Sequence, residues 1–140
     1  MDVGSDSGVG RLLVVDDDEM ILRSMKRALT RSGFQVEVAA SGAEAIERAG
    51  AVDLDVAILD LALPDASGLD VLKGIKVRDP TVECIVFTGH TSAPVAVDAY
   101  EAGAVEYFEK PITDWERFEE VVRRAVGLRR LARQQRPEAG

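Results

Sequence analysis

Residues 56–68, with the sequence VAILDLALPDASG, decide the fold of this chain. The segment begins with four apolar residues, and Asp60 follows them directly. A short apolar run bounded by turn signals is typical of a strand that is buried on both faces of a sheet. Pro64 and Gly68 then favour a turn. The segment therefore predicts a central strand with a carboxylate at its carboxyl end.

Three other short apolar runs also end in residues with useful chemistry. These residues are Asp16 with Asp17, Thr88, and Lys110. The carboxyl ends of parallel strands meet at one edge of a sheet, and open α/β folds bind their ligands at that edge. We therefore expect these side chains to share one crevice with Asp60.

The chain alternates strand patterns with helix patterns five times. Apolar residues recur at helical spacing in residues 19–31, and Ser41 with Glu44 has the capping-box pattern that begins a second helix. Such alternation indicates an α/β fold, with a parallel sheet and helices on both of its faces. The expected strands are 12–15, 34–38, 56–59, 82–87 and 105–109, and the expected helices are 19–31, 41–50, 69–77, 93–102 and one from 114.

Length and composition are those of a single globular domain. The chain has 140 residues, of which 46% are hydrophobic. Residues 1–10 lack the features of a secretory signal, and no apolar stretch approaches the ~18 residues that cross a bilayer. The single cysteine, Cys84, lies in an apolar strand pattern and excludes an internal disulfide. We therefore expect a cytoplasmic protein with no membrane contact.

Charge is spread unevenly along the sequence. The net charge of −8 argues against direct binding of nucleic acid. Residues 123–140, however, contain six arginines and one glutamate. We predict a flexible N-terminal segment at 1–10, a main domain at 11–128, and a basic helix extension and tail at 129–140. The extension is a candidate linker to an output domain.

The predicted crevice suits phosphoryl transfer. Three carboxylates close together repel one another, and a hard divalent cation such as Mg²⁺ relieves that repulsion. Asp60 can then attack a phosphoryl group and form an aspartyl phosphate. The charge that spreads over the phosphoryl oxygens needs a cation and a hydroxyl nearby, and Lys110 and Thr88 supply them.

Five motifs together resemble the receiver domain of two-component response regulators. The resemblance covers residues 11–128, and it implies a flavodoxin-like (βα)5 doubly wound fold with the strand order 2-1-3-4-5. The motifs are VVDDD at 14–18, ILDLALPDASG at 58–68, FTGH at 87–90, AGA at 102–104 and EKP at 109–111.

The resemblance also implies roles for the residues of the crevice. Asp60 corresponds to the phosphoacceptor, and Lys110 corresponds to the lysine that contacts the phosphoryl group. Asp16, Asp17, Asp60 and the backbone carbonyl of Ala62 correspond to the ligands of Mg²⁺ or Mn²⁺.

Further positions match the switch of the family. Thr88 is the switch hydroxyl, and Tyr107 is either the aromatic switch or a strand aromatic that packs on the last helix. Gly89 and His90 lie where the family controls access of water to the phosphate, and we interpret His90 as a solvent-facing gate. The bond before Pro111 is cis in the family, and cis bonds occur mainly before proline.

The implied function is signal transduction rather than enzymatic turnover. A sensor histidine kinase or phosphotransfer protein would donate the phosphoryl group, and the phosphate would switch a protein-interaction face. The main alternative is a pseudo-receiver that binds partners without phosphorylation, although no member of the acidic and lysine set is missing. A haloacid-dehalogenase-like hydrolase would need a second acid where Ala62 stands. A nucleotide-binding enzyme would need a glycine-rich phosphate loop after the first strand.

The last helix is expected to be long, from Asp114 to about Gln134. Five of its residues alternate spacings of three and four, the pattern of a coiled-coil seam. We therefore predict a homodimer, formed through this helix or through the face made by the fourth helix, fifth strand and fifth helix. Alternatively, the first half of the helix is an ordinary core face, and its arginine-rich end frays because Gly127 weakens the helix. The seam residues are Phe118, Val121, Ala125, Leu128 and Ala132.

Overall fold

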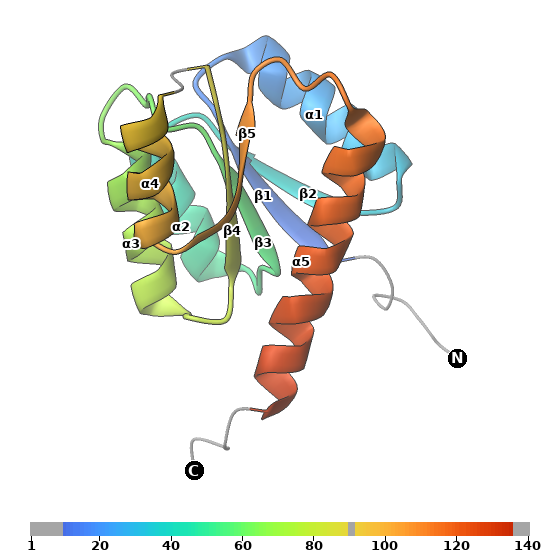
Figure 1. Ribbon diagram of the computed structural model, residues 1–140. Helices are drawn as coiled ribbons and strands as arrows, with labels where there is room; N and C mark the ends of the chain where they lie inside the picture. The colour runs from blue at the N-terminus through green and yellow to red at the C-terminus, as the bar shows by residue number, and fades with distance from the viewer. Residues whose placement is uncertain (1–9, 90–91, 136–140) are drawn as a thin grey trace.

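The computed structural model describes residues 10–89 and 92–135 of the chain (Figure 1). Strands and helices alternate throughout this part of the molecule. His90 lies outside the described residues, as do residues 1–9 of the predicted N-terminal segment and residues 136–140 of the predicted tail. The elements are β1 (Arg11–Val15), α1 (Glu19–Arg31), β2 (Gln35–Ala39), α2 (Gly42–Ala51), β3 (Val56–Leu59), α3 (Gly68–Arg78), β4 (Glu83–Thr88), α4 (Ala93–Glu101), β5 (Ala104–Glu109) and α5 (Trp115–Gln135).

The strands form one parallel sheet in the order β2-β1-β3-β4-β5. This order confirms the flavodoxin-like fold that the resemblance implied. The observed strands and helices begin and end within a residue or two of the predicted positions, which is the usual uncertainty of element boundaries.

Helices cover both faces of the sheet (Figure 1). Leu12 and Val14 of β1 pack against α1 and α5, whereas Leu13 and Val15 pack on the side of α2, α3 and α4. Side chains of a strand alternate between its two faces, so a fully apolar strand supplies both halves of the core. This explains why β3 and residues 12–15 of β1 are entirely apolar.

Local capping fixes where the helices begin beside the sheet edge. The carboxylate of Asp18 accepts hydrogen bonds from the amides of Met20 and Ile21 and so begins α1. Ser41 accepts from the amide of Glu44 at 3.1 Å, which confirms the predicted cap of α2. The Glu44 side chain accepts from the amide of Ala40, one residue earlier than in the usual capping box.

Helix α5 runs to Gln135, as predicted, but its apolar face is used differently from the prediction. Phe118, Val121 and Ala125 are buried in the core beneath the sheet. The predicted coiled-coil seam is therefore wrong over this half of the helix, because these residues already pack within their own domain. Leu128 and Leu131 remain 42% and 50% exposed.

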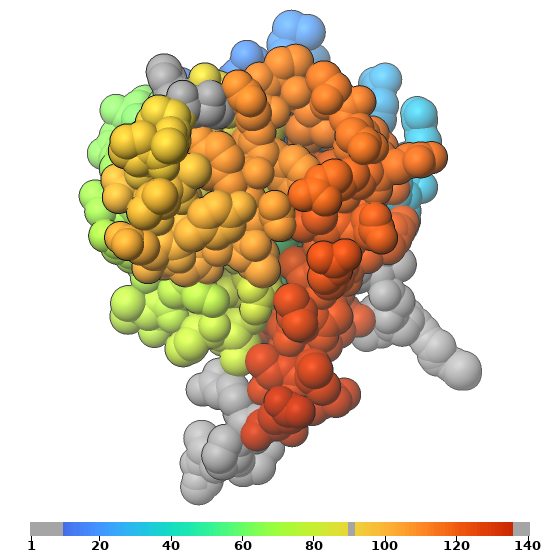
Figure 2. All heavy atoms as spheres, in the orientation of Figure 1, coloured from blue at the N-terminus to red at the C-terminus, as the bar shows by residue number. Residues whose placement is uncertain are grey.

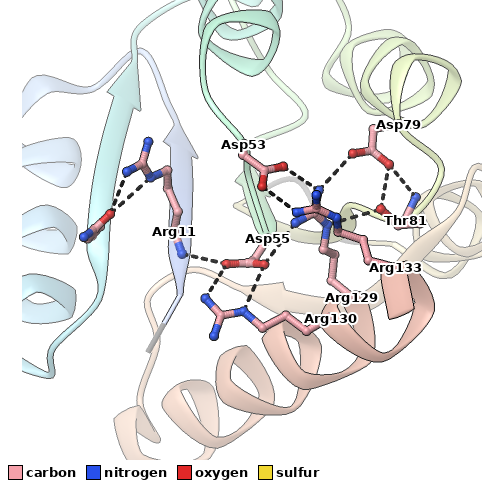
Figure 3. A network of polar contacts seen from close by, with 9 residues as sticks. Arg11, Asp53, Asp55, Asp79, Thr81, Arg129, Arg130 and Arg133 are labelled. Atoms are coloured by element: carbon pink, nitrogen blue, oxygen red, sulfur yellow. Dashed lines mark hydrogen bonds and ion pairs between the residues drawn. The ribbon is translucent and has the colours of Figure 1, made fainter. Parts of the chain in front are cut away.

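The end of α5 is held by a group of acids and arginines at the amino-terminal edge of the sheet (Figure 3). Arg129 is only 2% exposed. Its guanidinium donates to Asp53 at 2.8 Å and to Asp79 at 2.9 Å. It also donates to Asp55 at 3.3 Å. We call this group the arginine cluster, and its members are Asp53, Asp55, Asp79, Thr81, Arg129, Arg130 and Arg133.

The other two arginines complete the arginine cluster. Arg130 pairs with Asp55 at 3.2 Å, and Arg133 pairs with Asp53. The backbone amide of Arg11 also donates to Asp55, at 2.9 Å. Arg129, Arg130 and Arg133 are thus all paired with acids of the domain. The structure shows residues 127–135 as the last turns of α5, in contrast to the predicted alternative of a frayed arginine-rich end.

Two further features concern Cys84 and the apolar character of the helices. Cys84 is buried, and its burial raises the pKa of the thiol to about 12, so it is an unreactive core residue. Among the described residues, no helix is long and apolar enough to cross a membrane.

Candidate phosphoacceptor site

The carboxyl ends of the central strands bring the predicted site residues together. Asp16 follows β1, Asp60 follows β3, Thr88 ends β4 and Lys110 follows β5. Because β1 and β3 are paired in register, with Val15 opposite Leu59, the next residue of each strand reaches the same level.

The three predicted acids form a cluster at this edge. Asp16, Asp17 and Asp60 each offer a carboxylate oxygen, and these oxygens lie within 4.8 Å of one another. Asp16 and Asp60 are buried, whereas Asp17 is exposed. The cluster is therefore anchored in the domain and accessible from one side. Together with Lys110, these acids form what we call the acidic pocket.

Lys110 lies between the two buried acids. Its Nζ is 2.6 Å from Asp16 Oδ2 and 2.9 Å from Asp60 Oδ2. It also lies 5.0 Å from the centre of the Phe87 ring. Burial acts to lower the pKa of Lys110, but the hydrogen bonds to both acids outweigh it, so the pKa is raised and the ammonium keeps its charge.

Burial also changes the pKa of Asp16. Burial raises its pKa above the usual range, although hydrogen bonds from Lys110 and from the amide of Asp18 favour its charged form. One lysine therefore does not fully offset the cost of placing carboxylates in this pocket. An all-oxygen group of donors with excess negative charge fits a hard divalent cation.

The loop between β3 and α3 is closed on itself next to Asp60. Ala62 and Ser67 pair across the loop, and the amide of Gly68 donates to the carbonyl of Leu61 at 2.9 Å. A Cβ at Gly68 would come within 2.2 Å of the Asp60 carbonyl oxygen, so only glycine fits there. The amide of Ala62 donates to Asp60 Oδ1 at 3.2 Å, which orients the carboxylate.

The switch positions lie beside the acidic pocket. Thr88 is fully buried, and its carbonyl accepts from the amide of Lys110 at 3.0 Å. Tyr107 is partly buried and packs against the core on the side of α2, α3 and α4. The alternative in which Tyr107 packs on the last helix is therefore wrong, because α5 covers the other face of the sheet.

The remaining predicted positions are placed as follows. Gly89 is exposed, and a Cβ added there would meet no atom of the described residues within 4 Å. The Lys110–Pro111 bond is cis, as the resemblance implied. His90 falls outside the described residues.

Comparison with known proteins identifies the family. Residues 12–123 match the response regulator receiver domain. The chain belongs to this family. It is a phosphoacceptor signalling module of two-component systems and not an enzyme in the usual sense.

A curated relative is a longer regulator. The acid tolerance regulatory protein ActR of Rhizobium meliloti is 44% identical over 100 residues, which cover 71% of this chain and 52% of ActR. The chain thus spans about half the length of this relative.

Two solved structures of receiver proteins have the same fold. The beryllofluoride-activated NtrC4 receiver domain dimer is 35% identical and superimposes with a TM-score of 0.79 over 85% of this chain and 98% of that one. TrrA from Thermotoga maritima, solved in complex with Mg²⁺ and beryllofluoride, is 28% identical with a TM-score of 0.75, over 83% of this chain and 98% of that one.

The sequence did not predict the arginine cluster, nor the hydrogen bonds that the amides of Gly42 and Ala43 in α2 donate to Asp65. A signal for the former exists in retrospect. Arg129, Arg130 and Arg133 share one side of a helix, and acids stand before β3 and β4, at residues 53, 55 and 79. Pairing them requires knowing that α5 passes beneath these strands.

Proposed function

We propose that this receiver domain accepts a phosphoryl group on Asp60 from a sensor histidine kinase or a phosphotransfer protein, with Mg²⁺ or Mn²⁺ as cofactor. The observation that carries this proposal is the acidic pocket, in which the buried Asp60 is held by Lys110 beside two further carboxylates. No other described group of acids offers its oxygens to a cation in this way.

The chemistry follows from the positions of the side chains. A carboxylate oxygen of Asp60 attacks the phosphorus atom, the bond from phosphorus to the donor's histidine nitrogen breaks, and that nitrogen keeps the electron pair. Lys110 compensates charge on the phosphoryl oxygens, and the hydroxyl of Thr88 would donate to one of them once the phosphoryl group is bound.

The cation would be held by Asp16, Asp17, Asp60 and the carbonyl of Ala62. When bound, it would neutralise charge on the phosphoryl oxygens and on the carboxylates themselves. The complex of TrrA with Mg²⁺ and beryllofluoride supports this assignment, because TrrA has the same fold.

The phosphate would be read at the face formed by α4, β5 and α5, which Figure 2 shows as one continuous surface. Val97 and Tyr100 of α4 are exposed. We propose that Thr88 and Tyr107 change position on phosphorylation and alter this face, and that a second copy of the chain binds there or at the end of α5. The activated NtrC4 dimer supports a homodimer. We place the protein in the cytoplasm, where histidine kinases present their phosphoryl groups.

The direct test is phosphorylation by a small-molecule phosphodonor with Mg²⁺, followed by intact mass. The wild type should gain one phosphoryl group, and Asp60→Asn should gain none while melting no lower without metal, because asparagine removes charge repulsion in the pocket. Asp70→Asn, an exposed acid of α3, is the matched control and should react like the wild type. Full phosphorylation of Asp60→Asn would refute the site, and an unreactive wild type would favour the pseudo-receiver.

The dimer needs its own test. Light scattering before and after phosphorylation should show an increase in mass for the wild type and a smaller increase for Leu128→Glu. A monomer in both states would contradict the dimer proposal and leave the phosphoacceptor assignment untouched.

A further inference from the structure

We propose that α2 braces the cation site through Asp65, which acts as a positioning residue for the loop that carries Ala62. The inference rests on the proposed function, since it concerns the same cation site. Asp65 lies at the tip of the β3–α3 loop and is exposed, so it does not belong to the acidic pocket itself.

The first observation is a pair of hydrogen bonds between the loop and the helix. Asp65 Oδ1 accepts from the amide of Gly42 at 2.8 Å, and Oδ2 accepts from the amide of Ala43 at 3.0 Å. Amides in the first turn of a helix have no partner within the helix and favour an anion. The bonds from Gly42 and Ala43 hold the pKa of Asp65 below its usual range.

These bonds add to a cap that already exists. Ser41, the residue before α2, accepts only from the amide of Glu44. The amides of Gly42 and Ala43 are therefore satisfied by a residue about twenty positions later in the sequence. A contact of this kind fixes the loop relative to α2 as well as capping the helix.

The second observation is close packing at the same place. Gly42 is buried, and a Cβ there would lie 3.0 Å from Val71, 3.1 Å from Ala66 and 3.2 Å from Asp65 Oδ1. Helix α2 thus approaches the loop and the start of α3 more closely than a larger residue allows. A side chain at Gly42 would therefore crowd the Asp65 carboxylate that accepts the two hydrogen bonds.

The third observation connects both ends of this brace to the acidic pocket. On one side, Ala62 shares the closed loop with Asp65, and its amide donates to Asp60. On the other side, α2 follows β2, and the carbonyl of Ala39 in β2 accepts from the amide of Asp16 at 3.1 Å. The brace therefore joins the segments that carry both buried acids.

Because the β3–α3 loop is already held by these bonds, it loses less conformational entropy when the cation binds. Residues that orient metal ligands from outside the ligand shell typically change metal affinity by about 10–100-fold. We expect the lower end of that range here, because Asp65 acts on one backbone carbonyl and one carboxylate, whereas Asp16 and Asp17 belong to the segment that follows β1.

The experiment measures Mg²⁺ affinity by calorimetric titration of the intact chain. Asp65→Ala removes the brace and a charge, whereas Asp65→Asn removes the charge but keeps an acceptor for the amide of Gly42. Affinity should fall about tenfold in Asp65→Ala and considerably less in Asp65→Asn. Asp70→Ala removes a charge nearby and should match or exceed the affinity of Asp65→Asn.

A second variant removes no charge at all. Gly42→Ala pushes α2 away from the loop, so it should also weaken Mg²⁺ binding, whereas Gly127→Ala, where an added Cβ meets nothing within 4 Å, should leave it unchanged. Equal affinity in Asp65→Ala, Asp65→Asn and Asp70→Ala, with wild-type affinity in Gly42→Ala, would overturn the brace. Absence of Mg²⁺ binding in the wild type would instead refute the cation site on which the inference rests.

Discussion

Three aspartates gather at each end of the central strands, and the two groups differ in the cations that accompany them. The acidic pocket, at the carboxyl ends, has Lys110 between its buried members. The arginine cluster, at the amino ends, has three arginines for its three acids (Figure 3). The aspartates of the acidic pocket thus outnumber the cations beside them, whereas those of the arginine cluster are matched by an equal number of arginines.

The difference in charge indicates a difference in role. A buried charge is tolerated when it is paired and hydrogen-bonded, and a planar guanidinium with five donors can satisfy several carboxylates at once. The arginine cluster therefore stabilises the position of α5, and its carboxylates are already paired and do not need a bound cation. The acidic pocket keeps excess negative charge, and a cation and a phosphoryl group can supply what it lacks.

The largest effect on stability is expected when Arg129, the central residue of the arginine cluster, is replaced. Arg129→Met should lower the free energy of unfolding by about 3–5 kcal/mol, because it removes the buried cation that Asp53, Asp55 and Asp79 share. Asp55, which is 3% exposed, would keep Arg130 and the backbone amide of Arg11 as partners. Denaturant unfolding measures the loss.

The control for Arg129→Met is Arg124→Met, an exposed arginine on the same helix. It removes the same charge and should change stability by no more than a few tenths of a kcal/mol. Equal losses in the two variants would mean that net charge, and not the arginine cluster, sets the stability of this end of the domain.

The second prediction concerns the binding of Mg²⁺ to the acidic pocket. Mg²⁺ at about 100 times its dissociation constant should raise the free energy of unfolding by about 2.7 kcal/mol. Asp17→Ala should lose most of this gain, since it removes a ligand from the acidic pocket. Arg129→Met should keep the full gain, because the two groups lie at opposite edges of the sheet and act independently. Melting curves with and without Mg²⁺ decide this, and a lost gain in Arg129→Met would show that the two ends are coupled.

Acid should weaken the arginine cluster by a smaller amount. Hydrogen bonds from Arg129 lower the pKa of Asp53, and those from Thr81 and Arg129 lower the pKa of Asp79 against the opposing effect of burial. Carboxylates with a lowered pKa stabilise the fold above their unfolded pKa of about 3.9, and this stabilisation is lost as the pH falls through the lowered value.

The measurement is the unfolding free energy between about pH 5 and pH 2. The arginines that face these acids, including Arg130 and Arg133, stay charged over the whole range. The wild type should therefore lose stability more steeply with acid than Arg129→Met, in which the acids have lost their main partner. Parallel curves for the two proteins would contradict the assigned pKa shifts.

The sequence predicted the acidic pocket well because its residues follow local rules. Each of Asp16, Asp60, Thr88 and Lys110 ends an apolar run, and parallel strands bring such ends together. The strand order itself came from the resemblance to a family and not from periodicity. The roles of these residues in phosphorylation stay predictions until they are measured.

The sequence predicted α5 less well, for a physical reason. A helix that covers a sheet and a helix that pairs in a coiled coil both place apolar residues at spacings of three and four. Phe118 and Val121 fit either pattern, and in the structure they pack against the sheet of their own domain. The arginine cluster needs contacts between residues about 50 to 80 positions apart, which no local pattern contains.

The smallest predicted effect tests whether the end of α5 is a formed helix or a frayed one. Gly127 lies inside α5, is exposed, and has open space where a Cβ would be. In a formed helix, Gly127→Ala should stabilise the domain by up to about 1 kcal/mol, because alanine loses less backbone entropy than glycine. In the Arg129→Met background the gain should shrink, since without the arginine cluster the turns beyond Val126 are less firmly held. Denaturant unfolding of the four proteins gives the coupling directly. An equal gain in both backgrounds would mean that α5 keeps its helical end without the arginine cluster, and no gain in either would mean that this end of the helix is frayed in solution.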